Sequence, residues 1–128
     1  MIDVEMEIKR FLRITRKFEE IKRVKFMILF GSAAEGKLTE ESDIDICIYF
    51  DGNKKEGEKF RLKLISELPD YFDVKIFNSL SLYVRKEVLK GGSIFIADRK
   101  FTYEIFYKTL EEFEDFKKYL YDYVGMKA

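Results

Sequence analysis

The stretch FGSAAEGKLTEESDID, from Phe30 to Asp45, decides how this chain folds and what chemistry it can carry out. An apolar run ends in Gly31-Ser32, and ten residues separate Ser32 from the first carboxylate of the pair Asp43 and Asp45. Glycine at the end of a strand lets the backbone approach a ligand closely. A helical turn that opens at Ser32 presents backbone amides that attract phosphate. We therefore expect a phosphate-binding turn beside two carboxylates.

The segments on either side of this motif have the patterns of β-strands. VKFMILF, residues 24–30, is a short apolar run that is typical of a buried strand. In DIDICIYF, residues 43–50, apolar residues alternate with Asp43, Asp45 and Cys47, which places the two carboxylates on one face. Two anions held this close repel each other, and a divalent cation between them relieves the repulsion.

A third carboxylate, Asp73, lies in YFDVKIF, residues 71–77, which also has the pattern of a strand. If this strand neighbours residues 43–50, then Asp43, Asp45 and Asp73 converge. Such a cluster suits two metal ions about 3.5–4 Å apart, the arrangement used in phosphoryl and nucleotidyl transfer. The chain has no His and one Cys, so zinc sites built on those residues are excluded. Carboxylate ligands favour Mg²⁺, with Mn²⁺ as the alternative.

Helical patterns alternate with these strands along the chain. Apolar residues recur at helical spacing over residues 3–23, 54–68, 80–90 and about 101–124, and residues 93–97 form a short fourth strand. This order predicts the α/β or α+β class, with a small mixed sheet flanked by helices. A chain of 128 residues is long enough for one domain with its own core, so we expect a single domain over residues 1–128.

Composition narrows the possible functions. Charged residues make up 38% of the chain, but 24 Lys and Arg balance 24 Asp and Glu. This balance argues against strong nucleic-acid binding by the chain itself, which usually needs a basic surface. The N-terminal residues are too charged for a signal peptide, and no apolar run is long enough to cross a membrane. We expect a cytoplasmic protein.

The last helix carries more apolar residues than one docking face needs. One stripe at helical spacing, which we expect to pack on the sheet, comprises Phe106, Leu110, Phe113, Leu120 and Val124. A second group comprises Ile105, Phe116, Tyr119 and Tyr123. It predicts either packing between the first helix and the sheet or contact with a partner protein, since interface cores are rich in Tyr and Phe.

Asp-x-Asp or Gly-Ser alone is usually a solvated strand face or an ordinary turn, but the two at fixed spacing are much rarer. Gly31-Ser32, ten residues and Asp43-Ile44-Asp45 resemble the signature of the DNA polymerase beta-like nucleotidyltransferases. The size and layout of the chain resemble the minimal members of that superfamily, the MNT proteins. These are antitoxins paired with HEPN-domain toxin RNases.

The resemblance implies a nucleotidyltransferase fold and a role for each motif residue. Gly31 and Ser32 match the residues that hold the triphosphate, and Asp43 and Asp45 match two metal ligands. Asp73 matches the third acidic residue, which helps bind the catalytic metal and activates the attacking hydroxyl. The implied cofactors are two Mg²⁺ ions, with ATP as co-substrate. The implied reaction transfers AMP to a tyrosine hydroxyl of a HEPN toxin, which silences it, within a hetero-oligomer.

Three residues bear on nucleotide binding. Many relatives have a basic residue after Gly-Ser, near the position of Glu35, and Lys37 is a candidate to supply that charge. Lys75 shares the face of Asp73, where it either faces solvent or contacts phosphate.

Two other functions remain open. One is an antitoxin that neutralises the toxin by covering it, with little or no catalysis. The other is nucleotidyl transfer to a small molecule or an RNA, although the charge balance argues against RNA.

Overall fold

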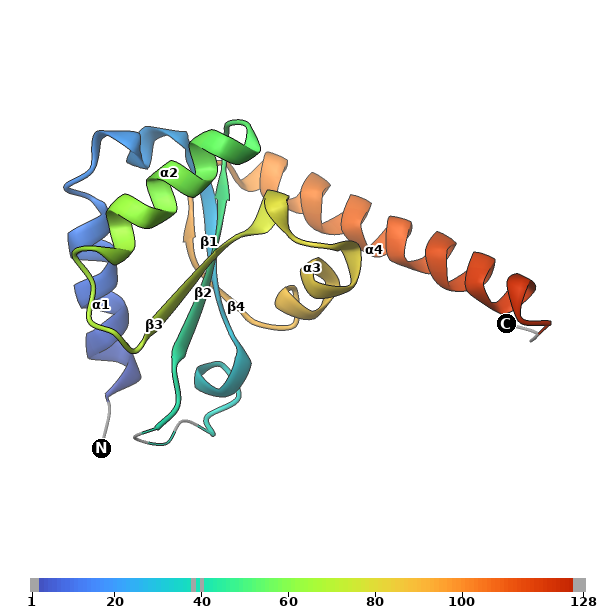
Figure 1. Ribbon diagram of the computed structural model, residues 1–128, viewed down its shortest axis with the longest axis horizontal. Coiled ribbons are helices and arrows are strands. Elements are labelled where there is room, and N and C mark those ends of the chain that lie inside the picture. Colours follow the sequence, from blue (N-terminus) through green and yellow to red (C-terminus); the bar gives the residue numbers. More distant parts are fainter. Residues whose placement is uncertain (1–2, 38, 40, 126–128) are drawn as a thin grey trace.

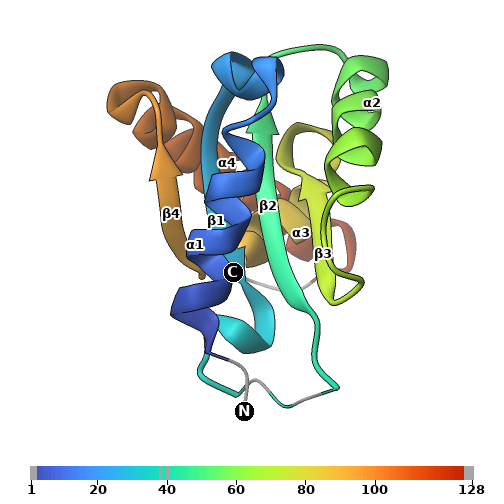
Figure 2. The same cartoon turned by 90° about the vertical axis from the view of Figure 1, so that its left-hand side faces the viewer.

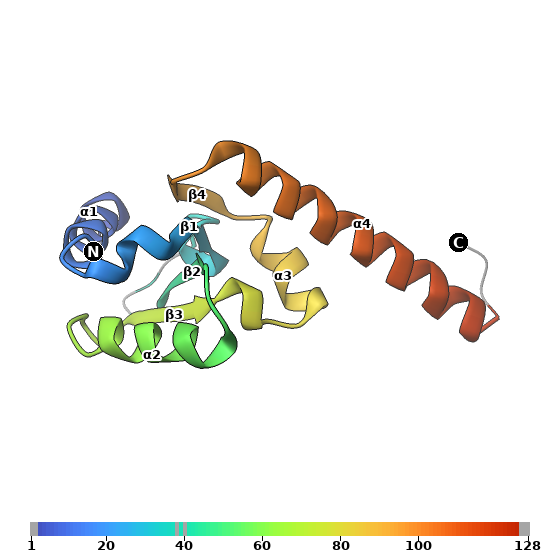
Figure 3. The same ribbon diagram turned by 90° about the horizontal axis from the view of Figure 1, so that it is seen from above.

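The computed structural model describes residues 3–37, 39 and 41–125. A four-stranded sheet lies between two pairs of helices (Figure 1, Figure 3). The strands are β1 (Val24–Phe30), β2 (Ile44–Phe50), β3 (Phe72–Ile76) and β4 (Gly92–Ile96). The helices are α1 (Val4–Thr15), α2 (Lys54–Ile65), α3 (Leu82–Val88) and α4 (Arg99–Tyr123). The predicted class, a small mixed sheet flanked by helices, is confirmed. None of the helices within the described residues combines the length and the apolar character needed to cross a membrane.

The strands are ordered β3-β2-β1-β4 across the sheet, as Figure 2 shows from the side of α1. β1 runs antiparallel to both β2 and β4, whereas β2 and β3 are parallel. A parallel pair needs a crossover, and α2 supplies it. The C-terminal end of β1 and the N-terminal ends of β2 and β3 therefore lie at the same end of the sheet. In the pairing of β2 with β3, Asp45 lies opposite Asp73.

The alternation predicted for β2 separates two apolar cores. Ile44, Ile46, Ile48 and Phe50 belong to the core that α1 and α2 cover. Within it, the Phe50 ring stacks on Phe60 of α2 with centroids 4.9 Å apart. Cys47 lies on the other face, where it is buried with residues of β1, α3 and α4. Burial raises the pKa of the Cys47 thiol, so this cysteine is a structural residue.

The first helix is shorter than its apolar pattern predicts. α1 ends at Thr15, whose hydroxyl donates to the carbonyl oxygen of Phe11, and a separate 3₁₀ turn spans Glu19–Arg23. Between them Phe18 adopts an extended conformation and packs edge-on against Phe60, with centroids 6.0 Å apart. The tertiary contact of this aromatic ring outweighs the continuation of the helix.

The first half of the last helix packs on the sheet, and the helix then continues beyond it (Figure 1). Phe106 packs on the α3–α4 core, and Phe113 is partly buried near Tyr83. The predicted docking stripe is wrong for its other three members, because Leu110, Leu120 and Val124 are exposed. Of the second predicted group, Ile105 packs on the core, whereas Phe116, Tyr119 and Tyr123 are exposed. An amphipathic pattern identifies an apolar face but not how far the surface beneath it extends.

Replacing Phe60 by Ala tests the core that supports β2. Phe60 is buried and contacts both Phe50 and Phe18. We expect Phe60→Ala to lower the free energy of unfolding by about 3–5 kcal/mol in urea denaturation, because the cavity left behind cannot collapse fully. The control is Leu62→Ala on the same helix. Leu62 is 52% exposed, and its loss should cost less than about 1 kcal/mol. Equal losses in the two variants would contradict this assignment of the core.

Candidate active site

The turn after β1 forms one wall of the candidate site. Gly31 has φ +69° and opens a 3₁₀ turn over Gly31–Ala33, which we call the Gly-Ser turn. The amides of Ala34 and Glu35 donate to the carbonyl oxygen of Gly31 at 3.1 and 3.2 Å. The turn was expected to begin at Ser32. It begins one residue earlier because glycine readily adopts the positive φ that turns the chain out of the strand.

Asp45 lies directly against this turn. A Cβ atom on Gly31 would lie 2.5 Å from Oδ2 of Asp45, a distance that real side chains do not tolerate. Phe30 and Asp45 pair across β1 and β2, which fixes this approach through the backbone. The absence of a side chain at Gly31 therefore lets the carboxylate of Asp45 sit beside the turn that is predicted to bind phosphate.

Asp45 and Asp73 form a carboxylate pair across the two parallel strands. The pKa of Asp45 is raised to about 6, first by burial, then by the charge of Asp73 and by a hydrogen bond to it. The charge of Asp43 raises this pKa further, and Lys75 opposes these effects. The ammonium of Lys75 lies 3.3 Å from Oδ2 of Asp73. Lys75 therefore pairs with the carboxylate on its own strand face.

Asp43 lies just before β2 and is exposed. Within residues 3–37, 39 and 41–125, no three Asp, Glu, Cys or His side chains are gathered closely enough to hold a metal ion. The structure thus brings Asp45 and Asp73 together, whereas Asp43 contributes charge from the exposed start of the strand. The predicted site of three carboxylates remains a prediction.

The sequence that forms this site matches a known protein family. Residues 13–100 match the family described as "Polymerase beta, Nucleotidyltransferase". The chain belongs to this nucleotidyltransferase family. The match covers β1, β2 and β3 and so contains the Gly-Ser turn and all three predicted carboxylates. The resemblance noted from the motif is confirmed.

Two relatives of this nucleotidyltransferase come from Methanocaldococcus jannaschii. MJ1547 is 33% identical over 93 residues, which cover 72% of this chain and 71% of the relative. MJ1379 is 44% identical over 71 residues, which cover 55% of this chain and 71% of the relative. Both are named as candidate protein adenylyltransferases.

Solved structures share the fold of the nucleotidyltransferase. A chain from a toxin-antitoxin structure with AMP-PNP superposes with a TM-score of 0.72 at 19% identity, covering 91% of this chain and 94% of the other. A chain from a structure of the tri-AMPylated Shewanella oneidensis HEPN toxin in complex with MNT antitoxin gives a TM-score of 0.68 at 17% identity, with 95% of each chain covered. At these identities the likeness establishes the fold.

The side chains of the nucleotidyltransferase suit a hard divalent cation. Asp45 and Asp73 offer carboxylate oxygens side by side, which is the ligand chemistry of Mg²⁺. Burial and mutual repulsion make the charge of Asp45 unfavourable, and a cation would remove that penalty. Asp43 would be the third oxygen donor at this edge of the sheet.

Sequence reasoning found Lys75 but missed the other surroundings of these carboxylates. Arg61 of α2 lies beside Asp73 in a hollow at the β3 edge, together with Glu58 and Lys75. Lys90 and Gly91, after α3, line a cavity with Gly31. The adjacent glycines Gly91 and Gly92 are the sequence signal for this contact, because glycine in a strand often marks close approach of another backbone.

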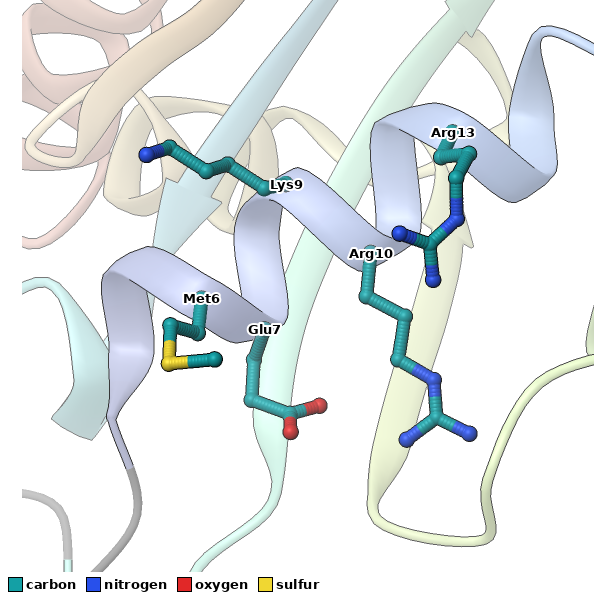
Figure 4. Close-up of a pocket in the computed structure, with 5 residues that line it drawn as sticks. All are labelled: Met6, Glu7, Lys9, Arg10 and Arg13. Atoms are coloured by element: carbon teal, nitrogen blue, oxygen red, sulfur yellow. The ribbon is translucent and has the colours of Figure 1, made fainter.

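A separate hollow of about 460 Å³ lies along the exposed side of α1 (Figure 4). Its lining includes Glu7 and Arg10, and both contact Tyr71: Glu7 accepts from the Tyr71 hydroxyl at 2.8 Å, and Arg10 donates to it at 3.4 Å. Glu7 is the one carboxylate among the lining residues, and α1 covers the face of the sheet opposite Cys47. This hollow offers no pair of carboxylates comparable to Asp45 and Asp73.

Gly31→Ala and Gly36→Ala form a matched pair that tests the packing of the Gly-Ser turn. Both glycines have positive φ, but a Cβ atom at Gly36 meets nothing within 4 Å. We expect Gly36→Ala to cost about 1 kcal/mol of unfolding free energy, from backbone strain alone. Gly31→Ala should cost about 2–3 kcal/mol, because its Cβ also displaces the Asp45 carboxylate. Urea denaturation measures both, and similar costs would argue against close packing at Gly31.

Asp45→Asn should stabilise the metal-free protein at neutral pH. The folded-state pKa of Asp45, about 6, exceeds its ordinary value of 3.8, so ionisation of Asp45 as the pH rises through 6 destabilises the fold. Asn keeps the shape and removes the charge. We expect a gain of about 1 kcal/mol at pH 7.5, less than the ~3 kcal/mol that corresponds to the full rise in the Asp45 pKa, because partial exposure screens the repulsion.

Urea denaturation in EDTA at pH 7.5 and pH 4.5 checks this prediction. The gain should shrink at pH 4.5, because this pH lies well below the folded-state pKa of about 6, so Asp45 is largely protonated in the folded state and carries little repulsive charge. Adding Mg²⁺ should stabilise the wild type more than the variant. A variant that is less stable than the wild type at pH 7.5 would show that the charge of Asp45 is already balanced without metal.

Proposed function

We propose that this chain is a metal-dependent protein adenylyltransferase that transfers AMP from ATP to a tyrosine hydroxyl of a HEPN RNase toxin and thereby neutralises it. The observation that carries the proposal is the juxtaposition of Asp45 with Asp73 and with Gly31 of the Gly-Ser turn. Family membership and the names of the two Methanocaldococcus relatives support transferase chemistry.

In the proposed reaction the Gly-Ser turn holds the triphosphate through backbone amides and the Ser32 hydroxyl. The acceptor oxygen forms a bond to the α-phosphorus of ATP, the bond from that phosphorus to the bridging oxygen breaks, and pyrophosphate leaves. Asp73 accepts the proton of the acceptor hydroxyl, and its ion pair with Lys75 orients the carboxylate. Mg²⁺ held by Asp43, Asp45 and Asp73 would neutralise charge on the phosphates.

The projecting end of α4 supports a protein partner. Phe116, Leu120 and Tyr123 recur at intervals of four and three residues on its exposed half, and Tyr123 is 79% exposed. Aromatic side chains of this kind are enriched in the cores of protein interfaces. The structures that share this fold include toxin-antitoxin complexes, one of which holds a tri-AMPylated HEPN toxin. A HEPN toxin is therefore the partner that we propose.

The test uses the protein encoded next to this one, if it is a HEPN-type chain. The purified pair is incubated with ATP and Mg²⁺, and the intact mass of the partner is recorded. We expect the partner to gain one or more AMP units with the wild type, and peptide mapping should locate them on tyrosine. The Asp43→Asn/Asp45→Asn double variant should give no gain, because it lacks two of the three proposed metal ligands.

The alternative is an antitoxin that neutralises its partner by covering it. The exposed aromatic residues of α4 favour this function, since binding alone would use them. If the wild type forms a stable complex and suppresses the RNase without any gain in mass, occlusion is the better account. Suppression by the double variant as strong as that by the wild type would lead to the same conclusion.

A further inference from the structure

A cavity of about 140 Å³ lies between the Gly-Ser turn and the junction of α3 with β4. Gly31, Ala34 and Glu35 line it from the side of the turn. Glu87, Lys90 and Gly91 line it from the side of the junction. The cavity therefore extends the candidate phosphate site toward an element that carries none of the motif residues.

Backbone packing holds this junction in place. A Cβ atom on Gly91 would lie 2.1 Å from the carbonyl oxygen of Leu29 and 3.0 Å from Cα of Phe30. The junction thus rests on the last residues of β1, immediately before the Gly-Ser turn. The amide of Gly91 also donates to the carbonyl oxygen of Val88 at 3.0 Å, which closes the end of α3. The backbone of Lys90 is therefore fixed next to the turn.

The charges in the cavity are unsuitable for a triphosphate unless a cation takes part. Glu35 and Glu87 both line it, and a carboxylate beside phosphate is repulsive. Among the described residues that line the cavity, Lys90 is the one cation. Its ammonium lies 3.1 Å from a Glu87 oxygen, and the side chain is 62% exposed, so it has room to turn. Lys37, the candidate from the sequence, is exposed and does not line the cavity.

We propose that Lys90 is the cation that binds the terminal phosphates of a nucleoside triphosphate seated on the Gly-Ser turn. The ammonium exchanges its contact with Glu87 for phosphate oxygens, which are stronger acceptors because they carry more charge. It remains protonated throughout and stabilises the charge of the departing pyrophosphate. The chain thereby supplies from the end of α3 the positive charge that Glu35 cannot supply from the turn. This inference rests on the proposed function.

Lys90→Met and Lys86→Met test the assignment. Both lysines approach Glu87, at 3.1 and 3.6 Å, but Lys86 lies over the Phe113 ring and does not line the cavity. Isothermal titration calorimetry on the full chain with Mg²⁺ measures the dissociation constants of a non-hydrolysable ATP analogue and of AMP. We expect Lys90→Met to weaken binding of the analogue about tenfold, the loss of one charged contact, and to leave AMP unchanged. Lys86→Met should bind both ligands as the wild type does.

A rescue variant separates this role from a structural one. Adding Glu35→Lys to Lys90→Met places a cation on the other wall of the cavity and should restore most of the affinity for the analogue. Unchanged binding by Lys90→Met, or equal weakening of the analogue and AMP, would overturn the assignment of Lys90 and leave the proposed function intact. A wild type that binds no ATP analogue at all would overturn both.

Discussion

The close approach of Gly31 to the carboxylate of Asp45 is the constraint on which the rest of the site depends. β1 must be followed by a residue without a side chain, because the antiparallel partner strand presents a carboxylate oxygen 2.5 Å from where the Cβ atom would lie. The same carboxylate faces Asp73 across the parallel pair β2–β3. One backbone position therefore determines how close the Gly-Ser turn can come to the acidic pair.

Repulsion between carboxylates is concentrated at the end of the sheet where β2 and β3 begin. Asp45 is partly buried next to another carboxylate, and Lys75, which forms its ion pair with Asp73, compensates only in part. Stability given up in this way is common at sites that bind cations and phosphates, where the ligand removes the repulsion. The chain neighbours of the two carboxylates, Ile44 and Ile46 in β2 and Phe72 and Val74 in β3, are buried in the core on the opposite face of the sheet.

Local patterns were sufficient to predict the strands and the faces of β2. Alternation placed Asp45 on the face of Cys47 and opposite the apolar core, and the spacing of Gly-Ser and Asp-x-Asp indicated the family. Contacts between distant segments could not be predicted in this way. Gly91 packs against the backbone of Leu29, which is far from it in the sequence, and no repeating pattern of residues predicts this contact. The charged residues around the Gly-Ser turn could therefore be identified only from the structure. The extension of α4 beyond the sheet could not be predicted either, because an amphipathic pattern does not show how much of a helix is covered by the rest of the protein.

The length of α4 has a geometric consequence. A continuous helix of 25 residues spans about 37 Å, and its first half is packed against the sheet that carries the acidic pair. The outer half of α4 is thus rigid. A protein bound there would be held at a fixed distance and orientation relative to Asp45 and Asp73. Each residue inserted into the exposed half would turn whatever lies beyond it by about 100° and move it 1.5 Å outward. Under the proposed function, the register of this one helix, and not only the chemistry at the strand ends, would determine which hydroxyl of a bound protein comes within reach.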